Sequence, residues 1–211
     1  NKSYEYQSGG ILSKDGYCRP FSDEANGTVF SNGIGVVVLK RLQDAIDSKD
    51  TIYAVINGRG VNNDGLDKLG FAAPSVSGQM ACIQDAMQEA QVTSEAIGFL
   101  EAHGTATALG DVVEINAITS VYREQTQKKQ FCALGSVKAN IGHMDVAAGM
   151  AGFIKTVLCL YHKKIPPLIH FSKANPKLEL DKSPFFVNTN LLDWISESTR
   201  KAAVSSFGVG G

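Results

Sequence analysis

Two short segments carry the residue types that could perform chemistry in this chain. The first is Glu101-Ala-His-Gly-Thr-Ala-Thr-Ala-Leu-Gly-Asp-Val-Val-Glu114, and the second is Lys138-Ala-Asn-Ile-Gly-His-Met-Asp-Val-Ala-Ala-Gly149. Each places a histidine among small residues and glycines, and each also contains charged residues a few positions from that histidine. A neutral imidazole can donate one hydrogen bond without being a strong acid. The two segments are therefore the candidates for a reactive site.

The first segment places His103 just after a predicted strand at 97–100, in a loop with little side-chain bulk. The glycine that follows allows close approach of the backbone, and Thr105 and Thr107 offer hydroxyl groups at the same place. Glu114 lies in the next predicted helix, where it could orient a neighbouring cation. For a lone histidine, the alternative is a core residue satisfied by backbone groups.

The second segment places Lys138 and His143 in a loop that ends at a predicted helix N-terminus. A helix N-terminus lowers the pKa of a nearby histidine and favours the neutral imidazole. The alternative is a surface loop with an incidental lysine and histidine. The order and spacing of the two segments together favour a functional site.

The C-terminal segment Ser205-Ser-Phe-Gly-Val-Gly-Gly211 is a third candidate. Glycines on both sides of Val209 leave its backbone N–H free to point into a site. The alternative is an ordinary glycine-rich strand end. The segment is not a dinucleotide-binding fingerprint, because no strand–GxGxxG–helix unit follows.

Strands and helices are predicted to alternate, which indicates an α/β fold with a mixed or mostly parallel sheet. Asp111 is expected to open a helix and to cap its free N–H groups with its carboxylate. The helix after Asp145 is apolar nearly all round, so we expect it in the middle of a layered structure. Strands are predicted at 33–39, 51–57, 97–100, 131–134, 185–187 and 202–207, and helices at 41–48, 77–91, 111–124 and 146–162.

Composition excludes several classes of function. The 211 residues are 44% hydrophobic and 19% charged, as in ordinary globular proteins. The net charge of -1 argues against nucleic-acid binding. No apolar run reaches the roughly 18 residues that span a bilayer, and no signal peptide is evident. The cysteines lack metal-ligand spacing, so we expect no metal and a cytoplasmic location. The four cysteines are Cys18, Cys82, Cys132 and Cys159.

Together the two histidine segments resemble the paired histidine motifs of β-ketoacyl synthases, the carbon–carbon bond-forming domains of polyketide and fatty acid synthases. Two further stretches, 9–21 and 62–65 followed by 73–76, match the polyketide synthase branch. Gly152 stands where the dissociated bacterial fatty acid enzymes usually carry glutamate, which favours a modular polyketide-type synthase over a fatty acid synthase. The sequence departs from the family pattern at Ala106, commonly Gly, and at Val112, commonly Pro.

The resemblance implies a decarboxylative Claisen condensation between a cysteine-bound acyl group and a malonyl-type extender. The extender would arrive on the phosphopantetheine arm of an acyl carrier protein, with no other bound cofactor. The resemblance also implies a role for each site residue. His103 and His143 would stabilise the enolate, Lys138 would hold the local field, Glu114 would balance its charge, Val209 would give an oxyanion-hole N–H, and Thr105 and Thr107 would touch the arm.

The resemblance further implies the C-terminal half of a thiolase-like fold, layered α-β-α-β-α, in a parent domain that forms a homodimer. The family attacks its acyl donor with a cysteine in a segment reading roughly Asp-Thr-Ala-Cys-Ser-Ser, and no cysteine here has that context. We therefore expect residues 1–211 to be one portion of a ketosynthase domain, without the half that bears the nucleophile. Alone it would be inactive and would expose apolar surface.

Other interpretations remain at this stage. A degradative thiolase would need a cysteine in its terminal glycine-rich loop, and a chalcone-synthase type would carry asparagine in place of His143; both disagree with the sequence. The more serious alternative is an inert half-domain, whether a fragment or a truncated product, or the partner half of a two-chain synthase.

Overall fold

The computed structural model describes residues 4–65 and 75–208. Its centre is a four-stranded sheet with the order β4-β2-β1-β6, in which every neighbouring pair is parallel. This confirms the α/β class. The strands are β1 (Ile97–Glu101), β2 (Cys132–Gly135), β4 (Phe185–Phe186) and β6 (Lys201–Val204). A separate antiparallel pair joins β3 (Lys164–Ile165) to β5 (Leu192–Asp193).

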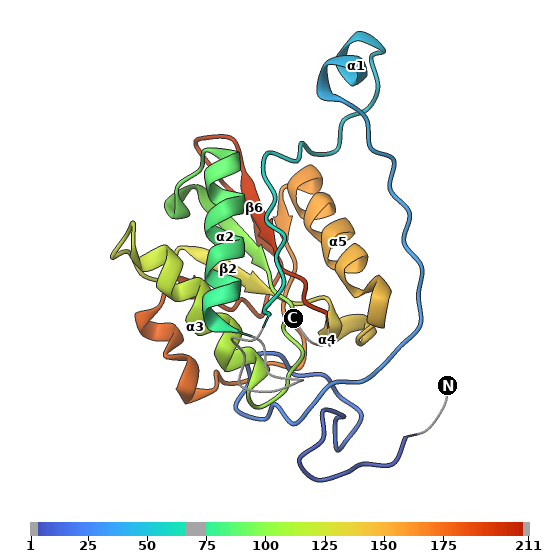
Figure 1. Ribbon diagram of the computed structural model, residues 1–211, viewed down its shortest axis with the longest axis vertical. Coiled ribbons are helices and arrows are strands. Elements are labelled where there is room, and N and C mark those ends of the chain that lie inside the picture. The colour runs from blue at the N-terminus through green and yellow to red at the C-terminus, as the bar shows by residue number, and fades with distance from the viewer. Residues whose placement is uncertain (1–3, 66–74, 209–211) are drawn as a thin grey trace.

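Helices cover both faces of the sheet (Figure 1). On one face lie α2 (Val76–Ala90) and α3 (Gly110–Arg123), which pack against each other, and on the other lies α5 (Ala148–His162). The described residues thus form three layers, α-β-α, of the five that the resemblance implies. The short helices are α1 (Leu42–Asp47), α4 (Lys138–Ile141), η1 (Ser94–Ala96), η2 (Asp145–Ala147), η3 (Pro176–Leu178) and η4 (Leu180–Lys182).

The core divides into two clusters because side chains alternate between the faces of a strand. In β2, Cys132 and Leu134 pack into the larger cluster together with α2 and α3, whereas Ala133 joins the smaller one. The smaller cluster contains Phe99 and Trp194, whose rings meet edge to face at 6.2 Å between centroids. The sheet is therefore apolar on both faces, as expected for parallel strands covered by helices.

Helix α5 packs through a stripe of small side chains. Its buried residues are Ala148, Gly152, Thr156 and Cys159. Among the described residues, the expectation that this helix lies in the middle of a layered structure is met on one side only: Val146, just before α5, is 98% exposed, and Leu158 and Tyr161 lie on its open side. Only one side of the helix contacts the sheet, so its apolar character exceeds what the described fold covers.

Two predicted strands do not form. Residues 33–39 and 51–57 run extended but pair with no strand among the described residues, while the helix predicted between them is α1, which projects from the body (Figure 1). Ile34 and Val38 are 89% and 93% exposed. A β-branched run becomes a strand only when a neighbour completes its hydrogen bonds and a layer covers it. The exposed apolar surface expected from the sequence is present here.

The other predicted strands and helices are confirmed, with ends that differ by at most three residues. Helix α2 illustrates why the local sequence suffices. The Ser75 hydroxyl accepts the N–H of Gly78 at 3.1 Å and so caps the first turn, and Gln91 ends the helix in a left-handed conformation. Residues 73 and 74 of the segment 73–76 that matches the family lie outside the described residues.

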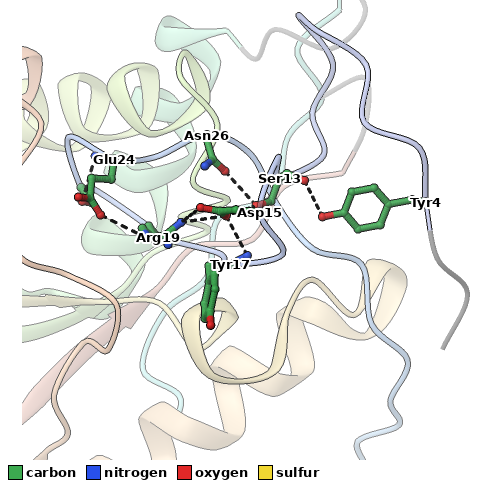
Figure 2. A network of polar contacts seen from close by, with 8 residues as sticks. Tyr4, Ser13, Asp15, Tyr17, Arg19, Glu24 and Asn26 are labelled. Atoms are coloured by element: carbon green, nitrogen blue, oxygen red, sulfur yellow. Dashed lines mark hydrogen bonds and ion pairs between the residues drawn. The ribbon is translucent and has the colours of Figure 1, made fainter.

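A polar network fixes the segment before the sheet (Figure 2). Arg19 forms an ion pair with Asp15 at 2.8 Å, and the Ser13 hydroxyl bonds both Asp15 and Asn26. The backbone of the same segment is anchored further along, where the N–H of Phe21 donates to Asp111 at 2.7 Å. The segment therefore lies against the start of α3, next to the first histidine motif.

Truncation of Ile115 tests the larger core cluster. Ile115 is fully buried in α3. Ile115→Ala is expected to lower the free energy of unfolding by about 2–5 kcal/mol, because it removes buried apolar groups and leaves a cavity. Chemical denaturation measures the change. Asn116→Ala, on the exposed side of the same helix, is the control and should shift stability by less than about 0.5 kcal/mol. Equal effects of the two variants would contradict this core.

Candidate active site

The candidate residues meet at one edge of the sheet. His103 follows β1, Lys138 follows β2, and Phe207 follows β6. Strand β1 pairs in parallel with both β2 and β6, so the carboxyl ends of the three strands lie side by side. In open parallel sheets this edge is where functional loops gather.

The two predicted histidines are brought together. The His103 and His143 rings lie edge to face, with centroids 5.4 Å apart and an interplanar angle of 84°. Phe207 packs on His103 at 5.0 Å, and Phe30 packs on His143 at 5.4 Å. The structure therefore joins the two sequence segments into one site with an aromatic border.

His103 has a defined tautomer and a strongly lowered pKa. Its Nδ1 accepts the backbone N–H of Phe207 at 3.3 Å, so the proton of the neutral ring is on Nε2. Burial lowers the pKa of His103 to about 2, and the positive charge of Lys138 and the neighbouring His143 act in the same direction. His103 is thus a neutral hydrogen-bond donor at physiological pH.

His143 has the same tautomer. Its Nδ1 accepts the N–H of Asp145 at 3.1 Å, which leaves the proton on Nε2. Its backbone is pinned on both sides, since its N–H donates to Val29 at 2.7 Å and its carbonyl accepts from Ser31 at 2.9 Å. The pKa of His143 is lowered, in the direction the sequence predicted, but the main causes are burial and then Lys138.

Gly142 makes this anchoring possible. Its φ is +75°, in the left-handed region, and a Cβ there would lie 2.7 Å from the carbonyl oxygen of Val29. Only glycine combines that backbone angle with such close approach. The glycine that precedes His143 in the motif is therefore a requirement of the backbone contact.

Glu114 holds the loop that carries His103. One oxygen of its buried carboxylate accepts the N–H of His103 at 2.7 Å, and the other accepts the N–H of Gly104 at 2.8 Å. Burial raises the pKa of Glu114 to about 7, against the effect of these two hydrogen bonds. The sequence suggested that Glu114 balances a positive charge; its direct contacts add a second role, which is to fix the loop.

Lys138 is buried and contacts the loop that carries His103. Its Nζ donates to the backbone carbonyl of His103 at 2.5 Å. Burial lowers the pKa of Lys138, and the negative charges of Glu114 and Glu101 oppose that effect. This lysine therefore ties the second motif to the first and contributes positive charge beside both imidazoles.

Asp111 does not cap helix α3 as predicted. The helix begins at Gly110, and it is the Thr107 hydroxyl that accepts the N–H of Gly110, at 3.2 Å. The buried carboxylate of Asp111 instead accepts the N–H groups of Phe21 and Ala106, at 2.7 and 3.0 Å. Burial raises its pKa to about 6. The capping prediction failed because a loop from the distant N-terminal segment occupies the carboxylate.

The two predicted carrier-arm residues lie next to each other. The hydroxyls of Thr105 and Thr107 are 3.0 Å apart and hydrogen-bonded. Val209, the predicted oxyanion donor, lies outside the described residues. The described part of its segment does reach the site, since the N–H of Ser205 donates to the carbonyl of Glu101 at 2.9 Å.

Sequence reasoning missed three residues that shape the site, namely Glu101, Lys155 and Phe207. Glu101 is buried and forms an ion pair with Lys155 at 2.7 Å. A signal was available for Glu101, because a charged residue directly after the predicted strand 97–100, two positions before a histidine, needs a partner. No sequence pattern pairs it with Lys155, which comes from a different layer.

The four cysteines, all within the described residues, are free, and three of them are buried. Cys18 contacts the loop of His103, with its sulfur 3.7 Å from the carbonyl of Thr105. Burial raises the pKa of Cys18 to about 11, so its thiol is a poor nucleophile. Among the described residues, no group of three or more acidic, histidine or cysteine side chains is arranged to hold a metal.

Comparison with known proteins decides the family. The family model for the β-ketoacyl synthase C-terminal domain matches residues 53–172, and that for the N-terminal domain matches residues 1–45. The chain belongs to the β-ketoacyl synthase family. It is 47% identical over 99% of its length to a phenolphthiocerol/phthiocerol polyketide synthase of Mycobacterium tuberculosis, and 43% identical over 99% to the polyketide synthase PksN of Bacillus subtilis.

Solved structures of ketosynthases support the same family assignment. The ketosynthase from module 6 of the bacillaene synthase of Bacillus subtilis superposes with a TM-score of 0.92 at 45% identity, over 96% of this chain. Ketosynthase twelve from the bacillaene synthase of Bacillus amyloliquefaciens gives 0.91 at 40% identity, over 99% of this chain. The thiolase-like fold and the relation to ketosynthases of modular polyketide synthases are thereby confirmed.

The β-ketoacyl synthase chain described here is shorter than these relatives. It spans 14% and 4% of the two curated synthases, and 36% and 37% of the two solved ketosynthases. The match of residues 1–45 to the N-terminal family model shows that the chain includes part of that domain as well. Within the described residues, no helix combines the length and the apolar character needed to cross a bilayer.

The neutrality of His103 is testable by nitrogen NMR of labelled histidine. We expect an Nε2–H tautomer that does not titrate between pH 8 and about 5, because burial and Lys138 disfavour the imidazolium. The same protein unfolded in urea is the control, where histidine should titrate near about 6.5. A folded-state midpoint above about 6 would contradict this description of the site.

The same shift has a consequence for stability. Between pH about 6.5 and about 2, His103 is protonated in the unfolded state but stays neutral in the folded state, because folding lowers its pKa. The contribution of His103 to stability is therefore fully present above about 6.5 and is lost progressively as the pH falls toward about 2.

Proposed function

We propose that this chain supplies the enolate-stabilising part of a ketosynthase active site that performs decarboxylative Claisen condensation in polyketide biosynthesis. One observation carries the proposal. The His103 and His143 rings lie 5.4 Å apart, and the Nδ1 of each is occupied by a backbone N–H. Each ring is therefore left with an Nε2–H that can donate to one shared oxygen.

The reaction creates a negative charge that the two Nε2–H groups can stabilise by hydrogen bonding. A malonyl-type extender on an acyl carrier protein loses CO2, and the electron pair of the broken C–C bond forms an enolate with its charge on the thioester oxygen. The enolate carbon attacks the carbonyl of an acyl group held as a cysteine thioester. A C–C bond forms, the C–S bond breaks, the cysteine leaves as thiolate, and the β-ketoacyl group remains on the carrier protein.

Neutral imidazoles suit the stabilisation of an enolate better than charged imidazoliums. An imidazolium would transfer its proton to the enolate and quench the nucleophile, whereas a neutral imidazole stabilises the oxyanion and keeps its proton. Burial and the charge of Lys138 keep both rings neutral. Lys138 adds a positive field at the same place, and Glu114 fixes the loop of His103.

The carrier arm fits the loop between His103 and α3. Thr107 accepts from Gly110 and is hydrogen-bonded to Thr105, so this pair of hydroxyls retains one O–H donor and free acceptor capacity. Those groups match the amides of a phosphopantetheine arm. By the family resemblance, the N–H of Val209 serves the acyl carbonyl.

The nucleophilic cysteine, in this proposal, comes from residues outside this chain, as does the layer that covers the extended segments 33–39 and 51–57. The burial of Cys18 and its raised pKa support this assignment. The complete domain would act as a cytoplasmic homodimer served by acyl carrier proteins, with the acyl and extender units set by residues elsewhere.

Removal of either histidine tests the enolate role. In the full-length synthase that contains this chain, His103→Ala and His143→Ala are each expected to lower the single-turnover rate of condensation about 100- to 1,000-fold, because each removes one oxyanion donor. The rate is followed by mass spectrometry of the carrier-bound product.

The matched control is His162→Ala, an exposed histidine at the end of α5. It should condense at the wild-type rate. Wild-type rates in the His103 and His143 variants would remove the basis of the proposal.

The source of the nucleophile is testable by intact mass. After exposure to an acyl-pantetheine thioester, we expect the acyl mass on a cysteine outside residues 1–211, because the thiol of Cys18, which contacts the loop of His103, is buried with a raised pKa. Peptide mapping locates the modified residue. Acylation of Cys18 would instead place the nucleophile within this chain and contradict the proposal. A sample that contains only this chain and stays unmodified would be the incomplete half.

A further inference from the structure

We propose that Glu101 is a positioning residue for the two-histidine site, and that it acts through the segment that carries Lys138 and His143. The expected effect of Glu101 on condensation rests on the proposed function. Its effect on the positions of Lys138 and His143 is argued from the contacts of Glu101. The role differs from that of Glu114, which contacts the loop of His103.

Glu101 contacts three parts of the fold: the start of α4, helix α5, and the segment that follows β6. It is the last residue of β1 and is 1% exposed. One carboxylate oxygen accepts the N–H of Val137 at 2.5 Å, and the other bonds Nζ of Lys155, on α5, at 2.7 Å. Its backbone carbonyl accepts the N–H of Ser205, which follows β6.

The contact with Val137 matters because α4 cannot hold itself in place. The helix has four residues, and Val137 is its N-cap, with no side chain that can cap it. A single turn of helix is not stable without outside contacts. The Glu101 carboxylate provides such a contact directly before Lys138, so the direction in which Lys138 leaves the backbone depends on it.

His143 depends on the same contact. It lies two residues beyond the end of α4, and α4 connects the end of β2 to the loop of His143. Displacement of the N-terminal end of α4 would therefore move Lys138 and His143 together. Val29 and Ser31 hold the far end of this segment, so Glu101 fixes the end that they do not reach.

Lys155 fixes the carboxylate in turn. Lys155 belongs to α5, and its side chain is 15% exposed, so the ammonium is mostly buried. A carboxylate held by one ammonium and one backbone N–H has little freedom to rotate. The pair thus transmits the position of α5 to the start of α4.

Gly152 offers a way to test the role without relying on deletion alone. A Cβ on Gly152 would lie 3.2 Å from Cγ of Glu101 and 3.7 Å from its Oε1. A carboxylate built on α5 at this position would therefore enter the space that Glu101 occupies. If Glu101 is shortened to alanine, Gly152→Glu can return the negative charge to the same place from a different element.

The experiment compares four forms of the full-length synthase that contains this chain: wild type, Glu101→Ala, the double variant Glu101→Ala with Gly152→Glu, and Glu95→Ala. Glu95 is the matched control, because it also accepts from a lysine and a neighbouring group, Lys128 and Thr126, but lies on the surface away from the site. Acyl loading of the cysteine and single-turnover condensation are measured separately, together with thermal melting.

We expect Glu101→Ala to lower the condensation rate about 100-fold, as displacements of catalytic groups by about 1 Å do, while acyl loading keeps its wild-type rate. The double variant should recover most of the lost rate, and Glu95→Ala should match wild type. Loss of the buried ion pair lowers the melting temperature under either role, so loading and recovery decide: a purely structural role would lower loading and condensation together, with no recovery in the double variant, and would overturn the inference. Wild-type condensation in Glu101→Ala would also overturn it.

A high-resolution structure of Glu101→Ala separates this inference from the proposed function. We expect the centroid distance between His103 and His143 to depart from 5.4 Å and the Lys138 bond to the His103 carbonyl to be lost. An unchanged arrangement overturns the inference. If the wild-type protein gives no condensation product, the proposed function fails, and this structural comparison still decides whether Glu101 positions the histidines.

Discussion

The parallel pairing of β1 with β2 and β6 is the constraint on which the site depends. Backbone hydrogen bonds in this ladder place three strand ends at one edge, and each end leads directly into a functional loop. His103, Lys138 and Phe207 are far apart in sequence and meet only because the strands run in the same direction. A reversed strand would send its loop to the opposite edge and leave the site incomplete.

Buried carboxylates then fix the loops that the sheet brings together. Glu101, Asp111 and Glu114 each accept backbone N–H groups from loops next to the site, and burial raises the pKa of all three. A buried carboxylate is costly unless such donors satisfy it. Lys138 lies near all three carboxylates, and it is burial together with the positive charge of this lysine that keeps both imidazoles neutral. The carboxylates therefore fix the geometry of the loops, while burial and Lys138 set the protonation state of the histidines.

The described fold leaves part of its apolar surface without cover. Helix α5 is buried along one stripe only, and the extended segments 33–39 and 51–57 expose Val and Ile side chains. The solved ketosynthases that superpose on this chain are longer, with 36% and 37% of their length matched. Strand predictions failed for these segments and succeeded for β1 and β2 because only β1 and β2 find both neighbouring strands and covering helices among the described residues.

The sequence by itself determined the α/β class, the elements with strong local signals, and the two histidine segments as parts of one site. Those features depend on the order of residues, because periodicity, caps and motif glycines are local. Tertiary structure alone decided the partners of the buried charges: that Asp111 holds Phe21 instead of capping α3, and that Glu101 meets Val137 and Lys155. Such pairs join layers of the fold, and no local pattern specifies which distant donor a buried carboxylate will find.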